Sequence, residues 1–420
     1  MPYIIGLNSG SSFDGVDAVL CEISLASDGH PCKPRYIDAL TLDWPEALRE
    51  PIQRAFDNDL TIFEMTRVNY AAGALFAEAV KQLLKQANLT AEDIEVIGYD
   101  GQTIYQEPPN RPAMAQYPPE SCESLVDIWL KGGHACGFFI VESGVVAGLT
   151  DITTVTQFRP VDHSLGGSGA PLMQYLDFVA FRNESSPVVT LNIGGISNVQ
   201  LVCGRDRSKM MAFDCGPGNV MIDHVVKART GRTYDEDGQL ASAGHVIDDL
   251  LQHLLNHEFF ARKPPRSAWR LDFGADYADR VLKQWHHASA EDLLATFTAF
   301  TAAAIESSVV DFILPKAAVH RIIASGGGAK NLCLLGLMRE RLSKRGIEVI
   351  ISDEVGLPAT YKEAIKFATL AYATRNGLAN NIPEASGASR YAVLGKLTLG
   401  PRMAKGTEPL GVNGVVTNGH

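Results

Sequence analysis

The sequence predicts an α/β protein of two domains, and three observations lead to this class. The chain has 420 residues, which is enough for two buried cores. Short apolar runs typical of strands are interspersed with amphipathic helical patterns. A unit of strand, polar glycine turn and strand occurs near residue 10 and again near residue 195. Two such halves indicate a cleft between related domains, where a nucleotide could be clamped.

The first half of the chain is expected to open with a β-hairpin. The expected strands are residues 3–7, 16–24, 94–99, 138–141 and 152–155. Apolar residues recur at helical spacing over 68–84, which predicts an amphipathic helix. Residues 107–119 are rich in proline and predict an irregular excursion.

The second half repeats the hairpin and then alternates strands with helices. The expected strands are residues 188–193, 199–202, 320–325 and 348–352, and the expected helices are 220–228, 293–310, 331–342 and 362–376. We expect a first domain of residues 1–157 completed by 386–402, a second domain of residues 158–385, and a loose tail over 403–420.

The composition is that of an ordinary globular enzyme, with 46% apolar and 20% charged residues. A net charge of −11 without a long basic run argues against binding to nucleic acid. Seven scattered cysteines without metal-binding spacing predict reduced thiols. The first residues resemble a strand rather than a signal peptide, and no apolar run is long enough to span a membrane. The expected location is therefore the cytoplasm, with no membrane contact.

Glycine-rich turns are the candidate phosphate contacts. Residues 9–17 could point several amides and hydroxyls at one spot, although such a turn is equally an ordinary hairpin. Gly194 and Gly195 form the tip of the second hairpin. Residues 326–328 are three glycines at a strand-to-helix junction, where an adenosine could lie against the backbone. No P-loop pattern occurs, and the dinucleotide-binding spacing is missing.

Two carboxylates are candidates for chemistry. Asp214 ends an apolar run and precedes a sharp turn that opens a helix. A catalytic base can occupy such a position beside bound phosphate, and a helix-capping aspartate is the alternative. Glu363 opens the last strong helix, as either a residue favoured by the helix dipole or a ligand contact. A glycine loop at 166–171, preceded by Arg159 and Asp162, could hold a hydroxyl or carboxylate or could be a flexible loop with a surface ion pair.

Taken in order, these motifs resemble the anhydro-N-acetylmuramic acid kinase family, including its eukaryotic relative levoglucosan kinase. The matching segments are residues 9–17, 101–103, 158–162, 166–171, 192–198, 213–219, 234–238, 326–331 and 362–364. Residues 391–396 are more similar to levoglucosan kinase than to the bacterial enzymes. The resemblance implies the two-domain fold of actin, hexokinase and the heat-shock chaperone ATPases, with ATP and sugar in the interdomain cleft.

The resemblance also implies roles for individual residues. Asp214 would be the base that activates water to attack C1 of a 1,6-anhydro sugar while O6 takes the γ-phosphoryl group. The implied ATP contacts are Gly10, Ser11, Ser12, Asp14, Gly15, Asp17, Gly194, Gly195, Gly216, Gly218, Asn219, Gly326, Gly327, Gly328 and Asn331. The implied sugar contacts are Gln102, Arg159, Asp162, Gly169 and Glu363, with Mg²⁺ at Asp214 and Glu363. A small sugar is the expected partner, and a homodimer is among the expected states.

Four places depart from the family pattern. Asp100 replaces a histidine, Gln157 replaces an aspartate, Ser168 replaces a glutamine, and residues 266–271 lose a glycine and an acid. Two alternatives therefore stand beside an anhydro-sugar kinase. One is an ordinary sugar kinase in which Asp214 deprotonates a sugar hydroxyl, and the other is a degenerate kinase that only binds nucleotide.

Overall fold

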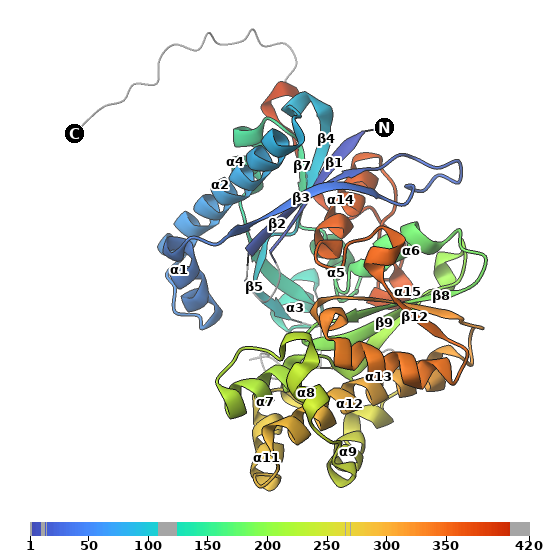
Figure 1. Ribbon diagram of the computed structural model, residues 1–420. Helices are drawn as coiled ribbons and strands as arrows, with labels where there is room; N and C mark the ends of the chain where they lie inside the picture. Colours follow the sequence, from blue (N-terminus) through green and yellow to red (C-terminus); the bar gives the residue numbers. More distant parts are fainter. Residues whose placement is uncertain are drawn as a thin grey trace.

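The computed structural model describes residues 2–9, 13, 15–107, 124–264, 266–268 and 270–403, and it contains two large mixed β-sheets (Figure 1). The first sheet consists of β1 (Tyr3–Asn8), β2 (Gly15–Glu22), β3 (Arg35–Asp43), β4 (Ile94–Gly98), β7 (Thr154–Thr156) and β13 (Lys396–Thr398). The second consists of β8 (Val188–Ile193), β9 (Ile196–Val202), β10 (Met211–Pro217), β11 (Arg321–Ser325) and β12 (Glu348–Ile351). A small separate sheet pairs β5 (Gln102–Glu107) with β6 (Cys136–Ile140).

Both large sheets have the same construction. In the first, β1 to β3 are consecutive antiparallel strands, while β4 and β7 continue from β1 in parallel. In the second, β8 to β10 are antiparallel and β11 and β12 continue from β8 in parallel. The two halves of the chain are therefore related in topology, although no repeat is visible residue by residue. The predicted α/β class with two sheets is confirmed.

The helices cover both sheets and fill the space between them. The first half contains α1 (Glu46–Phe56), α2 (Ile62–Ala87), α3 (Leu125–Leu130), α4 (Ser143–Thr150), α5 (Arg159–Ser164) and α6 (Met173–Phe181). The second contains α7 (Val220–Thr230), α8 (Gln239–Ala243), α9 (Asp248–Leu255), α10 (Arg270–Phe273), α11 (Ala275–Gln284), α12 (Ala290–Ser308), α13 (Leu332–Ser343), α14 (Lys362–Arg375) and α15 (Pro383–Ser386). Helices α2 and α4 cover the outer face of the first sheet, and α12 and α13 cover the outer face of the second.

Helix α2 illustrates how local sequence sets an element. Thr61 accepts a hydrogen bond from the Glu64 amide, and the Glu64 side chain bonds back to the Thr61 amide. This capping box starts the helix six residues before the periodicity alone predicted. The helix ends at Asn88, which adopts the left-handed conformation common after a last turn.

Helix α12 is the described segment that is long and apolar enough to cross a membrane. Its apolar stretch, Ala290–Ile313, is 83% buried inside the protein, as in the core helix of a globular domain. It packs against strand β10 and helices α7, α8, α9 and α13.

Helix α14 joins the two sheets. It packs against β1 and β4 of the first sheet and against α6, which in turn contacts β9 of the second sheet. One apolar cluster includes residues from both sheets and from these two helices, and Figure 1 shows them between the sheets. The domain boundaries stay a prediction. The packing of α14 favours assigning residues 362–375 to the domain of the first sheet, whereas the sequence analysis assigned them to the second domain.

Two predicted segments fall outside the described residues. These are the proline-rich excursion at 107–119, of which only Glu107 is described, and the tail at 403–420, of which only Met403 is described.

Candidate active site

A row of polar side chains crosses four strands of the second sheet. Asp214 on β10 pairs with Asn198 on β9, Asn198 pairs with Asn192 on β8, and Asn192 pairs with Ser325 on β11. Directly paired residues place their side chains on the same face of a sheet. That face points toward α6 and the first sheet, because Thr190, two residues before Asn192, contacts Asp177 on α6. The row therefore lines the side of the second sheet that faces the first.

Three predicted nucleotide turns meet at the end of this row. The Asn219 amide donates to Gly194 O at 2.8 Å, and the Gly218 amide donates to Gly195 O at the same distance. A Cβ atom on Gly328 would lie 3.0 Å from Asn219 Oδ1. The turns after β8, β10 and β11 thus form one cluster. Asn331 caps α13 beside it, with its side chain accepting a hydrogen bond from the Leu334 amide.

Packing requires some of these glycines and leaves others free. A Cβ on Gly218 would lie 2.3 Å from Gly194 O, and one on Gly328 would lie 2.2 Å from Ile193 Cγ2. By contrast, a Cβ on Gly195 or Gly327 would meet no protein atom closer than 3.7 Å. Both of these residues are exposed and have no left-handed backbone. The fold therefore does not explain why these two residues lack side chains, and their contact with ATP stays a prediction.

Three other glycines of the prediction, Gly216, Gly326 and Gly15, have structural explanations. Gly216 has a φ of 137°, and Gly326 has a φ of 83° with Asn192 Oδ1 2.7 Å from its Cβ position. Gly15 packs against Thr41 at the start of β2. Asp17, also on β2, accepts a hydrogen bond from Thr41 Oγ1.

The carboxyl group of Asp214 is held on one side only. Its Oδ2 accepts the Ala268 amide at 2.7 Å, while its backbone exchanges two hydrogen bonds with Arg266. No hydrogen bond reaches Oδ1 from the described residues. Burial raises the pKa of Asp214 to about 6, against the opposing effects of the Ala268 amide and the Arg266 guanidinium. The carboxyl group is thus poised to exchange a proton near neutral pH.

Arg266 belongs to the segment that departs from the family pattern, yet it supports this arrangement. Its guanidinium is buried among the rings of Phe213, Phe259 and Phe312 and donates to Arg262 O and Ser308 Oγ. The segment therefore keeps its place against Asp214 through the backbone of Arg266 and Ala268 and through the Arg266 guanidinium, whose Nε donates to Asp214 O at 3.0 Å.

Arg159 and Asp100, a predicted sugar contact and a departure from the family pattern, form an ion pair. Arg159 Nε lies 2.6 Å from Asp100 Oδ2, and the Phe158 amide donates to Asp100 Oδ1 at 3.0 Å. Arg159 Nη1 donates to Gly169 O at 2.7 Å. Asp100 therefore places a carboxylate beside Phe158 and Arg159. The family pattern has an aspartate at position 157, where this chain has a glutamine.

Glu363 lies on the first turn of α14, and three cationic side chains, Lys362, Lys366 and Arg159, affect its carboxylate. Its carboxylate pairs with Lys366, and its side chain is 42% exposed. Burial would raise its pKa, but Lys366 and Lys362 outweigh that effect and, with Arg159, lower it. Glu363 is thus an ionised group within electrostatic reach of Arg159, and the sugar contacts of both residues stay predictions.

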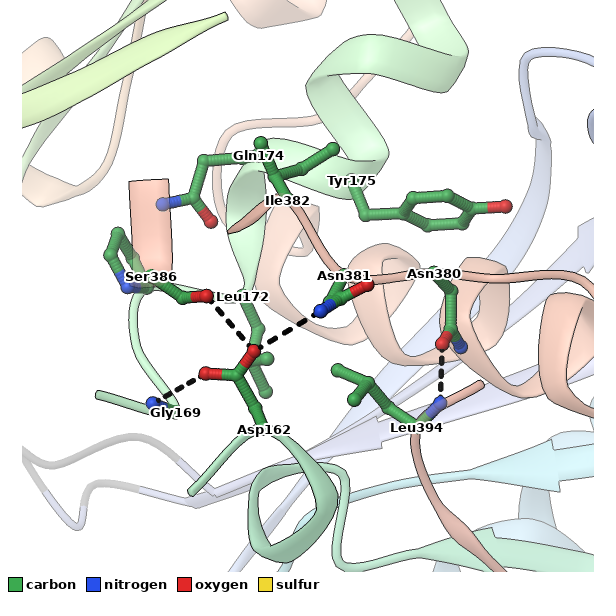
Figure 2. Close-up of a pocket in the computed structure, with 11 residues that line it drawn as sticks. Asp162, Gly169, Leu172, Gln174, Tyr175, Asn380, Asn381, Ile382, Ser386 and Leu394 are labelled. Atoms are coloured by element: carbon green, nitrogen blue, oxygen red, sulfur yellow. Dashed lines mark hydrogen bonds between the residues drawn. The ribbon is translucent and has the colours of Figure 1, made fainter. Parts of the chain in front are cut away.

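Asp162 has a different environment from the one expected of a sugar contact (Figure 2). Its carboxylate is buried and accepts hydrogen bonds from the Gly169 amide, Ser386 Oγ and Asn381 Nδ2. These bonds fix the loop at 166–171 against α15. Its contact with sugar stays a prediction, because the carboxylate already has partners within the protein.

Gln102 is also buried, and it anchors the first glycine turn. Ser9 Oγ donates to Gln102 Oε1 at 2.6 Å, and Trp44 Nε1 donates to Ser9 Oγ at 3.1 Å. The predicted ATP contacts Gly10, Ser11, Ser12 and Asp14 lie outside the described residues. Their role stays a prediction, as does the sugar contact of Gln102.

Some residues of the site were not found from the sequence. Asp223, one turn into α7, has its pKa raised to about 6 by burial. Asp223 follows the predicted ATP contact Asn219 by four residues, and in a helix this spacing places two side chains on the same face. Gly238 packs against Asn331, because its Cβ would lie 2.2 Å from Asn331 Oδ1. The Lys366 pairing with Glu363 was readable as a spacing of three within one helix.

Comparison with known proteins identifies the family. A family model described as anhydro-N-acetylmuramic acid kinase matches residues 2–117 and 127–400. The chain belongs to this family. A relative named anhydro-N-acetylmuramic acid kinase from Caldanaerobacter subterraneus subsp. tengcongensis is 37% identical over 402 residues, covering 94% of this chain and 96% of the relative. One of the same name from Clostridioides difficile is 34% identical over 403 residues, covering 95% and 99%.

Membership of the anhydro-N-acetylmuramic acid kinase family confirms the predicted family and enzyme class. The chain is an ATP-dependent kinase of anhydro sugars, which decides against a protein that only binds nucleotide.

Among solved structures, an activator of 2-hydroxyisocaproyl-CoA dehydratase from Clostridium difficile with bound ADPNP has a TM-score of 0.40 and 12% identity, covering 89% of this chain and 96% of that one. A ROK family glucokinase from Streptomyces griseus in complex with glucose and AMPPNP has a TM-score of 0.35 and 12% identity, covering 88% and 99%. These values are low, so the family assignment rests on the sequence relatives.

Proposed function

We propose that the chain hydrolytically opens 1,6-anhydro-N-acetylmuramic acid and phosphorylates its O6, with Asp214 as the catalytic base. The observation that carries this proposal is the position of Asp214. It lies beside the cluster of glycine turns, one carboxyl oxygen is held by Ala268, and burial raises its pKa to about 6.

The reaction requires one proton transfer and two displacements. Asp214 takes a proton from water, and the water oxygen forms a bond to C1 of the sugar. The bond between C1 and O6 breaks, O6 bonds to the γ-phosphorus, and ADP leaves with the bridging oxygen. The proton on Asp214 then returns to solvent. Phosphoryl transfer of this kind depends mainly on positioning and on stabilising charge.

Nucleotide binding is assigned to the glycine cluster. Gly195 and Gly327 are exposed and have room for a side chain, so their backbones can approach phosphate or ribose. Helix α7 begins beside the cluster and has no side-chain cap at Asn219, so the positive end of its dipole favours an anion there.

Sugar binding is assigned to Arg159 and Glu363. Arg159 is fixed by Asp100 and Gly169, and no hydrogen bond occupies its Nη2 within the described residues. A guanidinium held in this way can bind the lactyl carboxylate of the substrate. Glu363, partly exposed and ionised, can accept hydrogen bonds from sugar hydroxyls.

Magnesium is the cation expected with ATP. The described residues contain no group of three or more metal-ligating side chains. Magnesium bound with a nucleotide usually needs only one or two carboxylates, with phosphates and water as the other ligands. Glu363, which is ionised and partly exposed, fits that requirement. Contact of Mg²⁺ with Asp214 stays a prediction, because the one carboxyl oxygen of Asp214 that has no hydrogen bond within the described residues is assigned to the proton transfer. When bound, the ion would neutralise charge on the phosphates.

The first test is a coupled assay of ADP release. We expect release with 1,6-anhydro-N-acetylmuramic acid, and we would compare levoglucosan, which lacks the carboxylate, with glucose and N-acetylglucosamine. Release with levoglucosan alone would contradict the assignment of Arg159. No release with any sugar would overturn the proposed function.

The second test follows the water oxygen. In ¹⁸O-labelled water, the product should carry one label at C1 and none in the phosphate. Early trapping by reduction to the alditol prevents loss of label through anomeric exchange. An unlabelled early product would instead support an ordinary sugar kinase, in which Asp214 deprotonates a hydroxyl.

A further inference from the structure

Lys362 is the first residue of α14, and the proposed mechanism makes no use of its side chain. Its ammonium is 2% exposed and lies 3.0 Å from Asp177 Oδ1 on α6 and 3.4 Å from Ser325 Oγ at the end of β11. Asp177 is fully buried. Apart from this ion pair, its Oδ1 has no hydrogen-bond partner among the described residues. One buried ion pair therefore ties the helix packed on the first sheet to α6 and the second sheet.

The other oxygen of Asp177 continues into the second sheet. Thr190 Oγ1 lies 2.7 Å from Asp177 Oδ2 and 2.8 Å from Gln200 Oε1. Gln200 Nε2 donates to Asn198 Oδ1 at 2.6 Å. Asn198 is the strand partner of Asp214. A continuous polar path thus leads from the start of α14 to the residue opposite the proposed base.

The ammonium also touches the supports of both ligand sites. Lys362 is followed by Glu363, which is assigned to the sugar, and Ser325 is followed by Gly326, where the third glycine turn begins. Ser325 Oγ in turn donates to Leu191 O on β8. A shift of either α14 or β11 would therefore alter the contacts of one cation.

Stability alone does not account for this pair. Removing two charges from water costs about as much as their attraction returns, and apolar replacements of buried pairs are often neutral or stabilising. Apolar side chains such as Ile365 and Ala368 already hold α14 in the core. What a buried pair adds is a fixed relative position of its two partners.

We propose that Lys362 is a positioning residue that couples sugar binding at Glu363 to nucleotide binding at the glycine turns. The inference rests on the proposed assignment of these two sites. Lys362 does not touch a ligand itself, because its ammonium is buried and directed to Asp177 and Ser325. It fixes α14 relative to β11, so that a ligand which draws one element into place also places the other.

The test measures the coupling between ligands by calorimetry. The β,γ-imido analogue of ATP is titrated alone and with saturating 1,6-anhydro-N-acetylmuramic acid. In the wild type we expect the sugar to tighten nucleotide binding by about 5- to 150-fold, the usual range for coupled sites. Lys362→Met alone would leave a buried unpaired charge and could prevent folding. The double variant K362M/D177N removes both charges and keeps an amide to bond with Thr190.

We expect the double variant to fold, to bind each ligand alone, and to show a coupling factor near one. Its kcat should fall while its KM for ATP at low sugar stays near the wild-type value. A folded double variant with wild-type coupling would overturn the inference, and so would a wild type without coupling. ADP release by the wild type tests the proposed function independently of the coupling between the two ligands.

A matched control exists in a second buried ion pair. Arg182 at the end of α6 bonds twice to Asp28, in the loop between β2 and β3, at 2.9 and 3.0 Å. This pair also joins the first sheet to α6 but has no contact with either proposed ligand site. Asp28→Asn should lower the melting temperature and leave the coupling unchanged. Loss of coupling in this variant would show a general effect of loosening and would contradict a specific role for Lys362.

Discussion

At the scale of single residues, the proposed chemistry depends on the environment of Asp214. A carboxyl group with an ordinary pKa near 3.8 is a weak base, and burial raises that of Asp214 to about 6. The hydrogen bond from the Ala268 amide opposes this rise in pKa and fixes the orientation of the carboxyl group. The residue therefore combines a defined position with a basicity suited to neutral pH.

Replacing Asp214 with asparagine should remove the base and preserve the shape. We expect turnover to fall by roughly 10²- to 10⁴-fold, the usual contribution of a general base. The affinity for the β,γ-imido analogue of ATP should change little. ADP release at saturating sugar measures the first quantity, and calorimetry measures the second. Equal turnover in the variant and the wild type would exclude Asp214 from the mechanism.

The same carboxyl group predicts a pH dependence. Because the base must be ionised, kcat/KM should fall about tenfold per pH unit below the pKa of about 6 and level off above it. Asp223 also has a pKa raised to about 6, so Asp223→Asn serves to separate the two groups. The inflection should remain in that variant and disappear from the residual activity of Asp214→Asn. The opposite pattern would assign the titration to Asp223.

The contribution of Asp214 to stability should change with pH in the opposite direction: activity rises with pH, whereas the free energy of unfolding falls. The folded state holds the proton of Asp214 up to about pH 6, whereas an unfolded aspartate releases it near 3.8. Between these values the folded state binds more protons, so this group lowers the free energy of unfolding as pH rises. Urea unfolding of the wild type and of Asp214→Asn from pH 4 to 7 measures this effect. The free energy of unfolding of the wild type, relative to that of the variant, should decrease as the pH rises.

At the scale of elements, the turns after β8, β10 and β11 combine two kinds of glycine. Gly218 and Gly328 are needed so that the turns can pack together. Gly195 and Gly327 are not needed for packing. Substitutions at these two positions therefore test ligand binding without a direct effect on folding.

Substitutions at two of these glycines should therefore fail in different ways. Gly195→Val should fold normally and raise KM for ATP by about tenfold or more, equal to ~1.4 kcal/mol of lost binding. Gly218→Ala should mainly lower the melting temperature, because its Cβ would lie 2.3 Å from Gly194 O. Gly336→Ala, at an open position on α13, is the control for added bulk. Unchanged nucleotide affinity in folded Gly195→Val would make that turn a structural hairpin only.

At the scale of the whole molecule, two sheets that share five strands of the same topology, with β13 added to the first, are joined by α6 and α14. The proposed nucleotide turns lie on the second sheet, whereas Glu363 lies on a helix packed against the first. We expect the two parts to approach each other when both ligands are bound, because the reaction benefits from excluding bulk water.

Closure should be measurable in solution. We expect the radius of gyration from small-angle scattering to decrease when the β,γ-imido analogue of ATP and 1,6-anhydro-N-acetylmuramic acid are both bound. Calorimetry on the same samples controls for occupancy. An unchanged radius at full occupancy would mean that the cleft is rigid.

The sequence by itself determined the elements and the order of the motifs. Apolar periodicity located β1, β2, β8, β9 and the five helices α2, α7, α12, α13 and α14, because each pattern depends on neighbours in the chain. The glycine turns and Asp214 were found for the same reason, since a strand end followed by glycines is a local signal. Strand β3 was missed, because its nine residues are only partly buried and alternate weakly.

Only the tertiary structure decided which of these residues meet. It joined Asp100 to Arg159, which are 59 positions apart, and Lys362 to Asp177, which are separated in the sequence by all five strands of the second sheet. It also placed Asp162 and Gln102 behind the site, where neighbours satisfy their polar atoms. A side chain's partner and burial depend on how distant strands and helices pack, and that packing leaves no periodic signal in the chain.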